Sequence, residues 1–291
     1  MKFYTEKDLK LCTTLIKQAL KEDIGSGDKT SELLIDKNNI SEAKILVKHD
    51  GVIAGLEMFK LVFKIIDKNI KIKFISSEGD RVKKNEIIGT IKGSTVNVLK
   101  GERVALNILQ RMSGISTQVN SLRIKLKNNS VKLIDTRKTT PNFRIFEKLA
   151  VKIGGGENHR TGLYDMILIK DNHIEAAGGI ENVFQILEKK CKKNLKSREL
   201  KKEIEVKSLF ELMIVCTLGK GIIDRVMLDN FEIKDLKKAI TIVKGMFEIE
   251  VSGGINSDNI NKYSGIKGID FISIGALTHS VRSLDISLDF L

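Results

Sequence analysis

The second half of this chain alternates short apolar runs with helix-like segments, and this alternation constrains the fold more than any other feature of the sequence. Strand-then-helix units repeated along a chain favour parallel strands joined by right-handed crossovers. A complete barrel of this kind has eight units. Because six or seven are present here, we predict an incomplete or distorted α/β barrel, with an open doubly wound sheet as the second choice. The apolar runs span residues 131–136, 165–170, 203–208, 225–230, 247–252 and 270–275, and the helix-like segments include 144–153, 181–190 and 232–244.

The first hundred residues follow a different pattern, which predicts a mixed α+β fold. The expected elements are a helix over 7–20, a turn over 25–28 and strands over 43–48, 70–75 and 86–91. A long amphipathic stretch, 101–128, predicts a helix that breaks near Gly114 and connects the two halves of the chain.

The charge of the chain suits an anionic partner. Fifty Lys and Arg against 37 Asp and Glu give a net charge of +13, which fits nucleic acid, a membrane surface or a phosphorylated small molecule. Seven lysines crowd residues 189–202, and we interpret this segment as a solvated helix end and loop. A nucleic-acid surface more often interleaves aromatic side chains with basic ones, and this segment has no aromatic residue. Nucleic-acid binding is therefore the weaker alternative.

Three features bear on cellular location. No run of about 18 uncharged apolar residues occurs, so no membrane span is predicted. The first ten residues are rich in charge, which argues against a signal peptide. Cys12, Cys191 and Cys216 are too widely spaced for a metal signature or a disulfide framework. These features lead us to expect a cytoplasmic protein.

Polar or glycine-rich residues follow each predicted strand of the second half. In a parallel α/β barrel the carboxyl ends of the strands converge on one face, where active sites lie. The sequence therefore predicts a functional site at this face. Its strand ends are Thr136-Arg137-Lys138, Lys170-Asp171-Asn172, Glu205 with Lys207, Asp229-Asn230, Ser252-Gly253-Gly254 and Gly275-Ala276.

A group of cations is expected at this face. Like charges repel one another and are costly to desolvate, so they persist where a polyanion neutralises them. In the alternative interpretation, each cation pairs with a nearby carboxylate from Asp135, Asp165 or Asp171. The predicted cations are Arg137, Lys138, His159, Arg160 and Lys170.

Two acidic strand ends, Glu205 and Asp229, are candidate oxygen ligands for Mg²⁺. Salt bridges to Lys138 and Lys170 explain them equally well on spacing alone.

Two glycine-bearing turns, SGGI (252–255) and SIGAL (273–277), are candidate phosphate loops, although a tight turn explains either one. Lys170 as a Schiff-base nucleophile is a weaker hypothesis, because that chemistry gives no reason for several arginines and two such loops.

Residues 135–174, DTRKTTPNFRIFEKLAVKIGGGENHRTGLYDMILIKDNHI, strongly resemble the quinolinate phosphoribosyltransferases, also called carboxylating nicotinate-nucleotide pyrophosphorylases. The resemblance extends nearly end to end, in order, through residues 22–35, 51–59, 101–117, 226–230, 252–255 and 270–280.

This resemblance implies the reaction of quinolinate with phosphoribosyl pyrophosphate to give nicotinate mononucleotide, pyrophosphate and CO₂, in the synthesis of NAD. It implies an N-terminal α/β sandwich domain over 1–112, to which the tail 280–291 is a candidate addition, and an open α/β barrel of about seven strands over 113–279 that carries the active site. It also implies Mg²⁺, and a homodimer or larger oligomer in which Arg103 enters the neighbouring subunit's site.

The resemblance also implies roles for individual residues. Arg137, His159, Arg160 and Lys170, assisted by Thr136 and by Arg103 of a neighbouring subunit, are expected to hold the quinolinate carboxylates. Lys138, Glu205 and Asp229 are expected to face the phosphoribosyl group, with the two carboxylates near Mg²⁺; the choice of Glu205 over Glu203 depends on strand register. These three residues and Lys170 are the predicted catalytic residues. The backbones of Ser252, Gly253, Gly254, Ile274, Gly275 and Ala276 are expected to grip phosphate.

The sequence departs from the family pattern in two places. Lys207 and Ser208 replace a pair that is commonly acidic and then amide, and Asn142 stands where Gly commonly follows the proline. Asn tolerates that position if its φ is positive. The closest alternative function is that of a paralogue with the same fold, such as the pyrophosphorylase-like proteins linked to molybdenum transport, acting on a different acceptor.

Overall fold

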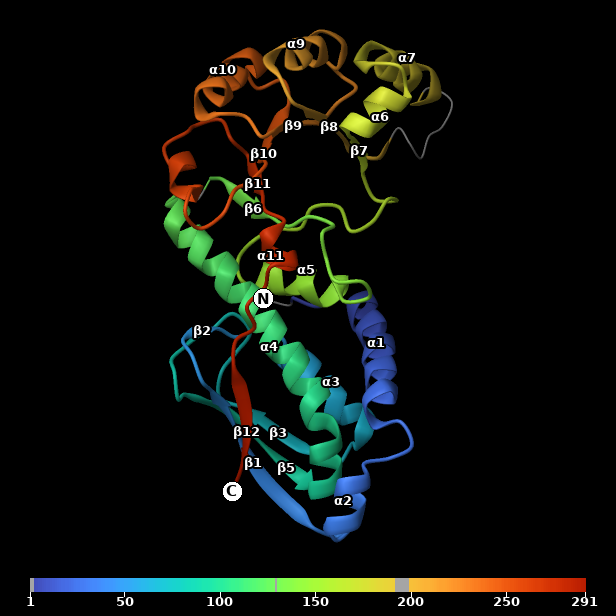
Figure 1. The fold of residues 1–291 in the computed structure, drawn as a ribbon, viewed down its shortest axis with the longest axis vertical. Coiled ribbons are helices and arrows are strands. Elements are labelled where there is room, and N and C mark those ends of the chain that lie inside the picture. The colour runs from blue at the N-terminus through green and yellow to red at the C-terminus, as the bar shows by residue number, and fades with distance from the viewer. Residues whose placement is uncertain (1–2, 129, 192–198) are drawn as a thin grey trace. The chain divides into compact units, whose positions relative to one another are not determined.

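The computed structural model describes residues 3–128, 130–191 and 199–291, which form two compact units (Figure 1). The first unit comprises Met1–Ser121, Lys138–Gly156 and Ala276–Leu291, and the second comprises Leu122–Arg137 and Glu157–Gly275. The two units are therefore interleaved along the chain. Most of the predicted lysine-rich segment, 192–198, lies outside the described residues.

The first unit contains a four-stranded antiparallel sheet in the order β12-β1-β5-β3. The C-terminal tail joins this sheet, because β12 pairs with β1. The helix expected over 7–20 and the three expected strands are confirmed. The elements are α1 (Glu6–Ile24), α2 (Lys29–Leu34), β1 (Ile40–Val47), β2 (Gly51–Val52), α3 (Leu56–Ile66), β3 (Lys71–Phe74), β4 (Arg81–Val82), β5 (Ile87–Ser94), α5 (Arg144–Ile153), α11 (Ala276–His279) and β12 (Ile286–Phe290).

Sequence signals at both ends of α1 explain its length. The side chain of Thr5 accepts a hydrogen bond from the backbone N–H of Asp8, and the Asp8 carboxylate accepts one from the N–H of Thr5. This reciprocal capping box satisfies N–H groups that a helix start leaves without partners. At the other end Gly25 has a φ of 52° and donates its N–H to the carbonyl of Lys21, which ends the helix.

The long helix α4 (Thr95–Leu126) is continuous over 32 residues, so the predicted break near Gly114 is wrong. Glycine has a different purpose there. A Cβ at position 114 would lie 2.3 Å from the carbonyl oxygen of Arg282 and 2.9 Å from the Cα of Ser283. The C-terminal tail thus passes directly against α4, and only a residue without a side chain leaves room for it.

The second unit contains six parallel strands in the order β6-β11-β10-β9-β8-β7. The first strand in the sequence pairs with the last and not with the second, which is the order of a barrel opened between its first two strands. The open-barrel prediction is confirmed, with six strands among the described residues instead of about seven, and the doubly wound alternative is wrong. The strands are β6 (Lys132–Ile134), β7 (Ile167–Ile169), β8 (Lys202–Val206), β9 (Arg225–Asp229), β10 (Glu248–Ser252) and β11 (Phe271–Ser273).

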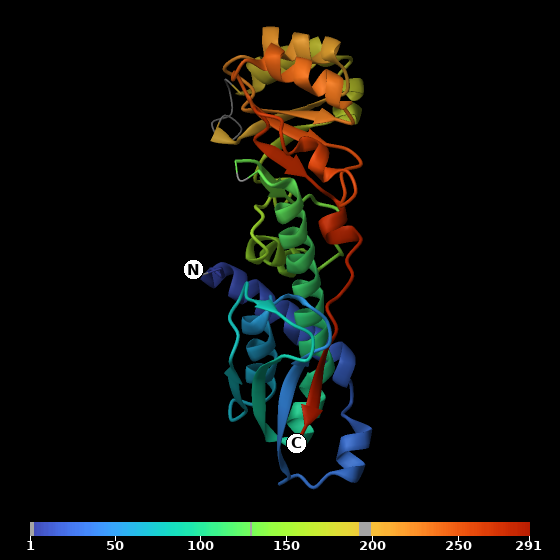
Figure 2. The same ribbon diagram turned by 90° about the vertical axis from the view of Figure 1, so that its left-hand side faces the viewer.

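Helices cover the outer face of this sheet (Figures 1 and 2). The predicted helix over 144–153 is confirmed in its bounds as α5, but it belongs to the first unit and not to the barrel. Within the described residues no helix is long and apolar enough to cross a membrane. The helical elements of the second unit are α6 (Asp171–Ala176), α7 (Ile180–Cys191), α9 (Leu209–Leu218), α10 (Ile233–Val243) and the 3₁₀ helix η1 (Ile260–Tyr263).

Candidate active site

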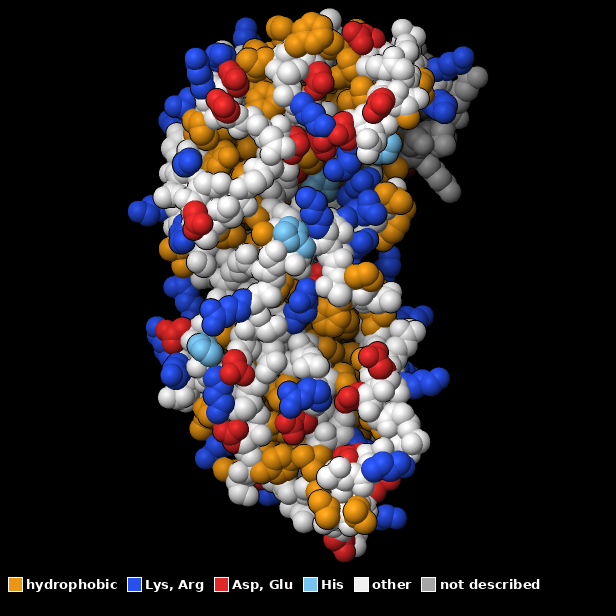
Figure 3. All heavy atoms as spheres, viewed as in Figure 1, with side chains coloured by type: hydrophobic (Ala, Val, Ile, Leu, Met, Phe, Trp, Pro, Cys, Tyr) orange, Lys and Arg blue, Asp and Glu red, His pale blue; other side chains and the backbone are white. Residues whose placement is uncertain are grey.

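The carboxyl ends of the six parallel strands bring most of the predicted site residues to one edge of the second unit. We call this edge the barrel mouth; it comprises residues 136–137, 170–172, 205–207, 229–230, 252–254 and 274–275. On the face seen in Figure 3, acidic and basic side chains lie next to one another over this end of the sheet. Three predicted site residues, Arg103, Lys138 and Ala276, belong to the first unit.

Strand register places the carboxylates of Glu203 and Glu205 on the same face of β8, because residues two apart in a strand share a face. Glu203 is fully buried among charged side chains of the barrel interior. Glu205 lies one step nearer the carboxyl end, is 8% exposed, and accepts a hydrogen bond of 3.3 Å from the ammonium of Lys170. Glu205 is therefore the carboxylate at the mouth, and Glu203 lies beneath it.

Two ion pairs lie at the mouth. One was an alternative in the sequence analysis, and the other was not predicted. Lys170 pairs with Glu205, as the salt-bridge alternative proposed. Asp171 pairs with Lys207 instead of with a predicted site cation. The hydrogen bond to Asp171 raises the pKa of Lys207, and the carboxylates of Glu205 and Asp229 raise it further. Both acidic strand ends therefore act on a single cation at the mouth.

The guanidinium of Arg137, at the mouth, lies within electrostatic range of that of Arg160, which is in the loop before β7. Desolvation and the charge of Arg137 lower the pKa of Arg160, while Asp165 and Glu203 oppose this shift. Arg160 also donates from Nη1 to the carbonyl of Met166 at 3.2 Å. The Asp165 carboxylate accepts backbone N–H groups of the loop, at 2.6 Å from Thr161 and 3.0 Å from Gly162. Positive charge is thus held close together at the mouth.

His159 lies just inside the mouth and is 8% exposed. Its backbone N–H donates to Asp135 Oδ1 at 2.9 Å, and the buried Asp135 also accepts from the Asn158 amide at 2.6 Å. The ring nitrogen Nδ1 accepts from the backbone N–H of Arg160 at 2.7 Å. The other ring nitrogen, Nε2, lies 3.0 Å from Glu203 Oε2 and 3.5 Å from Glu250 Oε2. Contacts with the protein therefore surround the imidazole ring.

A cluster of buried charges fills the barrel interior below His159, and sequence reasoning missed it. Arg225 Nη1 lies 3.1 Å from Glu250 Oε2 and 4.0 Å from Glu203 Oε2, while its Nε donates to Glu248 at 3.1 Å. Burial and the charge of Glu203 raise the pKa of Glu250 to about 8, and burial raises that of Glu203 to about 6. The signal was present in the strand runs KEIEV and EIEVS, where the glutamates recur at every second position and therefore share a face.

The described residues contain one group with the spacing of metal ligands, and it consists of His159, Glu203 and Glu250. It lies below the predicted Mg²⁺ ligands, Glu205 and Asp229. The guanidinium of Arg225 supplies a positive charge 3.1 Å from Glu250 Oε2 and 4.0 Å from Glu203 Oε2, while both oxygens of Glu203 and Oε1 of Glu250 are buried without a hydrogen bond to any described residue.

The first glycine turn contains two glycines with different surroundings: Gly253 is closely packed, and Gly254 faces open space. Gly253 has a φ of 101°, and a Cβ there would lie 2.2 Å from Asn230 Oδ1 and 2.7 Å from its backbone N. Gly254 has a φ of 58°, and a Cβ there would have no heavy atom within 4 Å. The first glycine thus permits close packing of two strand ends, and the second leaves the backbone accessible to a ligand.

The second glycine turn, residues 273–277, joins β11 to α11. Ile274 is buried and donates its N–H to the carbonyl of Ile134 at 3.0 Å, which ties this turn to β6. Gly275 follows at the mouth, and α11 begins at Ala276.

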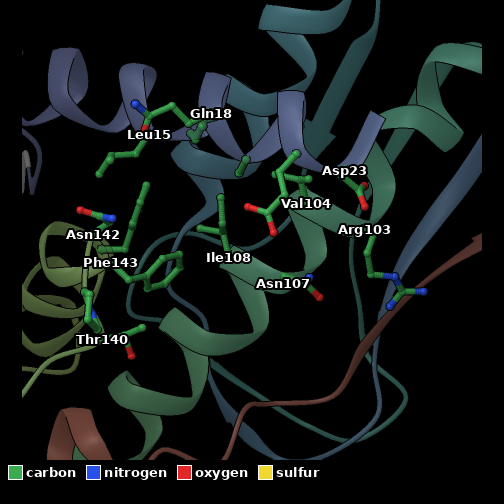
Figure 4. A pocket seen from close by; sticks show the side chains of 15 residues that line it. Leu15, Gln18, Asp23, Arg103, Val104, Asn107, Ile108, Thr140, Asn142 and Phe143 are labelled. Atoms are coloured by element: carbon green, nitrogen blue, oxygen red, sulfur yellow. The ribbon is translucent and has the colours of Figure 1, made fainter. Parts of the chain in front are cut away.

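In the first unit, Arg103 lines a pocket of about 570 Å³ between α1, α4 and the residues that precede α5 (Figure 4). Arg103 and Asn142 lie toward opposite ends of this pocket in the view shown. Asn142 has a φ of 61°, which meets the condition under which Asn is tolerated at the position where the family commonly has Gly. Its departure from the family pattern therefore leaves the local backbone intact.

Comparisons with known proteins cover nearly the whole chain. The families described as "Quinolinate phosphoribosyl transferase, N-terminal domain" and "C-terminal domain" match residues 28–113 and 115–289. A carboxylating nicotinate-nucleotide pyrophosphorylase of Arabidopsis thaliana, named as chloroplastic, is 40% identical over 287 residues, which cover 94% of this chain and 81% of that protein. A probable enzyme of the same name from Bacillus subtilis is 39% identical over 268 residues and covers 92% and 89%. The structure of the nicotinate-nucleotide pyrophosphorylase from Francisella tularensis has a TM-score of 0.88, 37% identity and 97% coverage of both chains.

Proposed function

This chain belongs to the quinolinate phosphoribosyltransferase family, and from that membership we propose that it transfers the phosphoribosyl group of phosphoribosyl pyrophosphate to quinolinate. Quinolinate loses one carboxyl group as CO₂, and the products are nicotinate mononucleotide and pyrophosphate. The observation that carries this proposal is the charge pattern of the barrel mouth. Arg137 at the mouth lies within electrostatic range of Arg160, and the carboxylates of Glu205 and Asp229 lie on neighbouring strands at the same edge. The cations suit a dicarboxylate acceptor, and the carboxylates suit the Mg²⁺ of a pyrophosphate donor.

The arginine side of the mouth is suited to the acceptor. Quinolinate carries two carboxylates, and Arg forms bidentate hydrogen bonds with this group. Arg137 and Arg160 supply two guanidinium groups, and Lys170 supplies an ammonium that Glu205 orients. Bound carboxylates would relieve the repulsion between the two arginines, which is a reason for the substrate to bind here. Thr136 and His159 complete the proposed acceptor side.

The carboxylate side of the mouth is suited to the phosphoribosyl group. Glu205 and Asp229 fit Mg²⁺ because both are oxygen donors and both already act on one cation, the ammonium of Lys207. When bound, Mg²⁺ supplies charge neutralisation of the pyrophosphate leaving group. Lys138 adds a further positive charge toward that group. The backbones of Ser252-Gly253-Gly254 and Ile274-Gly275-Ala276 are proposed to receive phosphate oxygens.

The proposed chemistry needs no protein nucleophile. The quinolinate nitrogen attacks C1 of the ribose while the bond from C1 to the pyrophosphate oxygen breaks, and the carboxylates of Glu205 and Asp229 stabilise the positive charge that develops on the sugar. The ring nitrogen is then quaternary. The bond to the C2 carboxylate breaks and CO₂ leaves, the electron pair left on C2 is stabilised by the adjacent N⁺, and C2 takes a proton from solvent water. The residues of the mouth therefore act through positioning and electrostatics.

The proposal includes a homodimer or larger oligomer in which Arg103 serves the site of a neighbouring subunit. Arg103 lies on α4 of the first unit, at an open pocket where its guanidinium is accessible. An additional cation for a dicarboxylate acceptor is consistent with this placement.

A cytoplasmic location is the last part of the proposal. Within the described residues Cys12 and Cys216 are free thiols, a state that a reducing compartment maintains. Recovery of the native protein in the cytoplasmic fraction of its cells is expected, and recovery with an organelle or membrane fraction would contradict it.

The direct test is an assay of the purified protein with quinolinate, phosphoribosyl pyrophosphate and Mg²⁺ that follows nicotinate mononucleotide and CO₂ together. We expect equal amounts of both products, no product with nicotinate in place of quinolinate, and loss of activity in EDTA that added Mg²⁺ restores. A folded protein without product would favour the paralogue with another acceptor. Activity that persists in EDTA would contradict the Mg²⁺ requirement alone.

A further inference from the structure

Lys207 has a fixed backbone and a side chain that can move. It follows β8 directly, and its backbone N–H donates to Glu211 Oε2 at 2.7 Å, in the first turn of α9. Its ammonium pairs with the carboxylate of Asp171 at the start of α6. Both side chains of this pair are about half exposed, and exposed ion pairs are weak because water screens them. Lysine also has a flexible four-carbon stem, so the ammonium can leave Asp171 at little cost to the fold.

The strand register brings the same ammonium to the two proposed ligands of Mg²⁺. In the parallel pair β8–β9, Lys207 and Asp229 occupy corresponding positions, one residue beyond the last paired residues of the two strands. Alternation puts Lys207 on the same face of the sheet as Glu205, two residues earlier. The pKa of Lys207 agrees with this placement: the hydrogen bond to Asp171 raises it, and the charges of Glu205 and Asp229 raise it further.

We propose that the ammonium of Lys207 competes with free Mg²⁺ for the carboxylates of Glu205 and Asp229, and that it favours Mg²⁺ bound to the pyrophosphate donor instead. This inference rests on the proposed function, in which these two carboxylates are the Mg²⁺ ligands and the donor binds beside them. Lys207 stands at one of the positions where this chain departs from the family pattern. It is thereby assigned as a residue that selects the form in which the ion binds.

The charge of the ligand decides the sign of the effect. A free divalent cation is repelled by an ammonium that already neutralises the same carboxylates. Mg²⁺ bound to pyrophosphate belongs to a complex with net negative charge, which the ammonium attracts. Because the side chain of Lys207 is about half exposed, salt should weaken both effects. One ammonium thus opposes the first ligand and favours the second.

The first test measures ion binding without turnover. Mn²⁺ is the probe, because free Mn²⁺ gives an electron paramagnetic resonance signal that is lost when the ion binds. In the full-length protein without substrates, Lys207→Gln should lower the dissociation constant of Mn²⁺ about three- to tenfold, whereas Lys207→Arg, which keeps the charge, should not change it. An equal constant in the wild type and in Lys207→Gln would overturn the proposal.

Two controls locate the effect. Lys83 pairs with Asp50 at 2.9 Å on the exposed surface of the first unit, so Lys83→Gln should leave the Mn²⁺ constant unchanged. If it lowers the constant as much as Lys207→Gln, the effect is one of net charge and the proposal is wrong. Glu205→Gln combined with Asp229→Asn should abolish the binding that Lys207 affects. Mn²⁺ binding at the wild-type level in that variant would place the ion elsewhere, which also contradicts the proposal.

The second test examines the opposite sign. A preformed equimolar mixture of Mg²⁺ and inorganic pyrophosphate is the probe, and isothermal titration calorimetry measures its binding. Lys207→Gln should bind this complex about three- to tenfold more weakly than the wild type does. Unchanged or tighter binding in Lys207→Gln would show that Lys207 only repels the ion, and the proposed selection would be refuted.

The two tests need no turnover, so failure of this proposal is distinct from failure of the proposed function. A protein that forms no nicotinate mononucleotide would refute the proposed function, even if Lys207→Gln changes ion binding as expected. An active protein whose binding of Mn²⁺ and of Mg²⁺ with pyrophosphate does not respond to Lys207→Gln would refute the role of Lys207 alone.

Discussion

At the scale of single residues, the second unit places charge in two layers that have different purposes. The upper layer faces solvent at the mouth and carries the groups proposed to meet the substrates. The lower layer is buried, and in it the guanidinium of Arg225 lies next to the carboxyl groups of Glu203 and Glu250. A substitution in the upper layer should change reaction rates, whereas one in the lower layer should change both stability and the placement of the upper layer.

Arg137 gives the most direct prediction for the upper layer. Arg137→Ala should lower kcat/KM for quinolinate roughly 30- to 1000-fold, because a charged contact to the acceptor is lost. This factor corresponds to about 2–4 kcal/mol of lost transition-state stabilisation. Steady-state kinetics of this variant would measure the loss. Arg123→Ala, a change of the same type at an exposed position near the end of α4, is the control and should retain wild-type kinetics. Near-normal kinetics for Arg137→Ala would remove it from the acceptor site.

Glu250 gives a pH-dependent prediction for the lower layer. Burial and the charge of Glu203 raise its pKa from 4.5 to about 8 in the folded protein. The folded state therefore holds this proton longer than the unfolded state, and the resulting stability, fully present below about pH 4.5, is lost as pH rises toward 8.

The side chain in Glu250→Gln does not titrate, so this variant should not lose that stability. The melting temperature of the variant minus that of the wild type should therefore rise between pH 5.5 and 8, by roughly 2–4 °C for each kcal/mol of stability that the wild type loses. Thermal unfolding at several pH values would measure this difference. Glu248→Gln should show no such gain, because the hydrogen bonds and charges of Lys201 and Arg225 outweigh desolvation and lower the pKa of Glu248. A constant difference between wild type and Glu250→Gln would show that the carboxyl group is not perturbed.

At the scale of secondary-structure elements, local patterns predicted what local forces determine. The six barrel strands of the described residues were predicted because each contains consecutive or alternating apolar residues and is followed by polar residues or glycine. The error at Gly114 arose from a contact with Arg282, which lies far along the chain. The buried charges were missed for a related reason. Alternation shows that Glu203 lies on the same strand face as Glu205, and Glu250 on the same face as Glu248. It does not show that these faces point into the barrel, where they contact Arg225 and His159.

The reason for glycine in α4 can be tested directly. Gly114→Ala should destabilise the protein by roughly 1–3 kcal/mol, because the new methyl group would meet backbone atoms of the tail that cannot move aside cheaply. Helix propensity alone predicts the opposite, since Ala favours helix by about 1 kcal/mol over Gly. Urea unfolding distinguishes the two signs, and Gly265→Ala, where a Cβ meets no atom within 4 Å, is the control.

At the scale of the whole molecule, the sequence resemblance predicted the family and the open barrel, while the interleaving of the two units along the chain was not predicted. Residues 138–156 follow the first strand of the barrel in sequence but pack with the first unit. A pattern of strands and helices gives their order but not which core each helix joins. For that reason α5 was assigned to the wrong unit although both its ends were predicted correctly.

The proposed sharing of Arg103 between subunits makes a prediction for the assembled protein. Arg103→Ala and Lys170→Ala should each be nearly inactive alone. If the protein is a dimer, mixing the two variants after dissociation and reassembly should restore about a quarter of the wild-type activity, because half of the dimers are mixed and one of their two sites is intact. Activity after mixing that stays at the level of the separate variants would show that each site uses its own Arg103.

The pairing of the earliest strands with the latest ones has a consequence for how the protein is made. β1, which begins at Ile40, needs β12, which begins at Ile286, and β6, which begins at Lys132, needs β11, which begins at Phe271. The ribosome adds more than two hundred residues after the start of β1 before β12 begins, and more than one hundred after the start of β6 before β11 begins. The strand edges that these late strands cover therefore stay unpaired while the intervening chain is made, and their protection by chaperones is part of the cost of this topology.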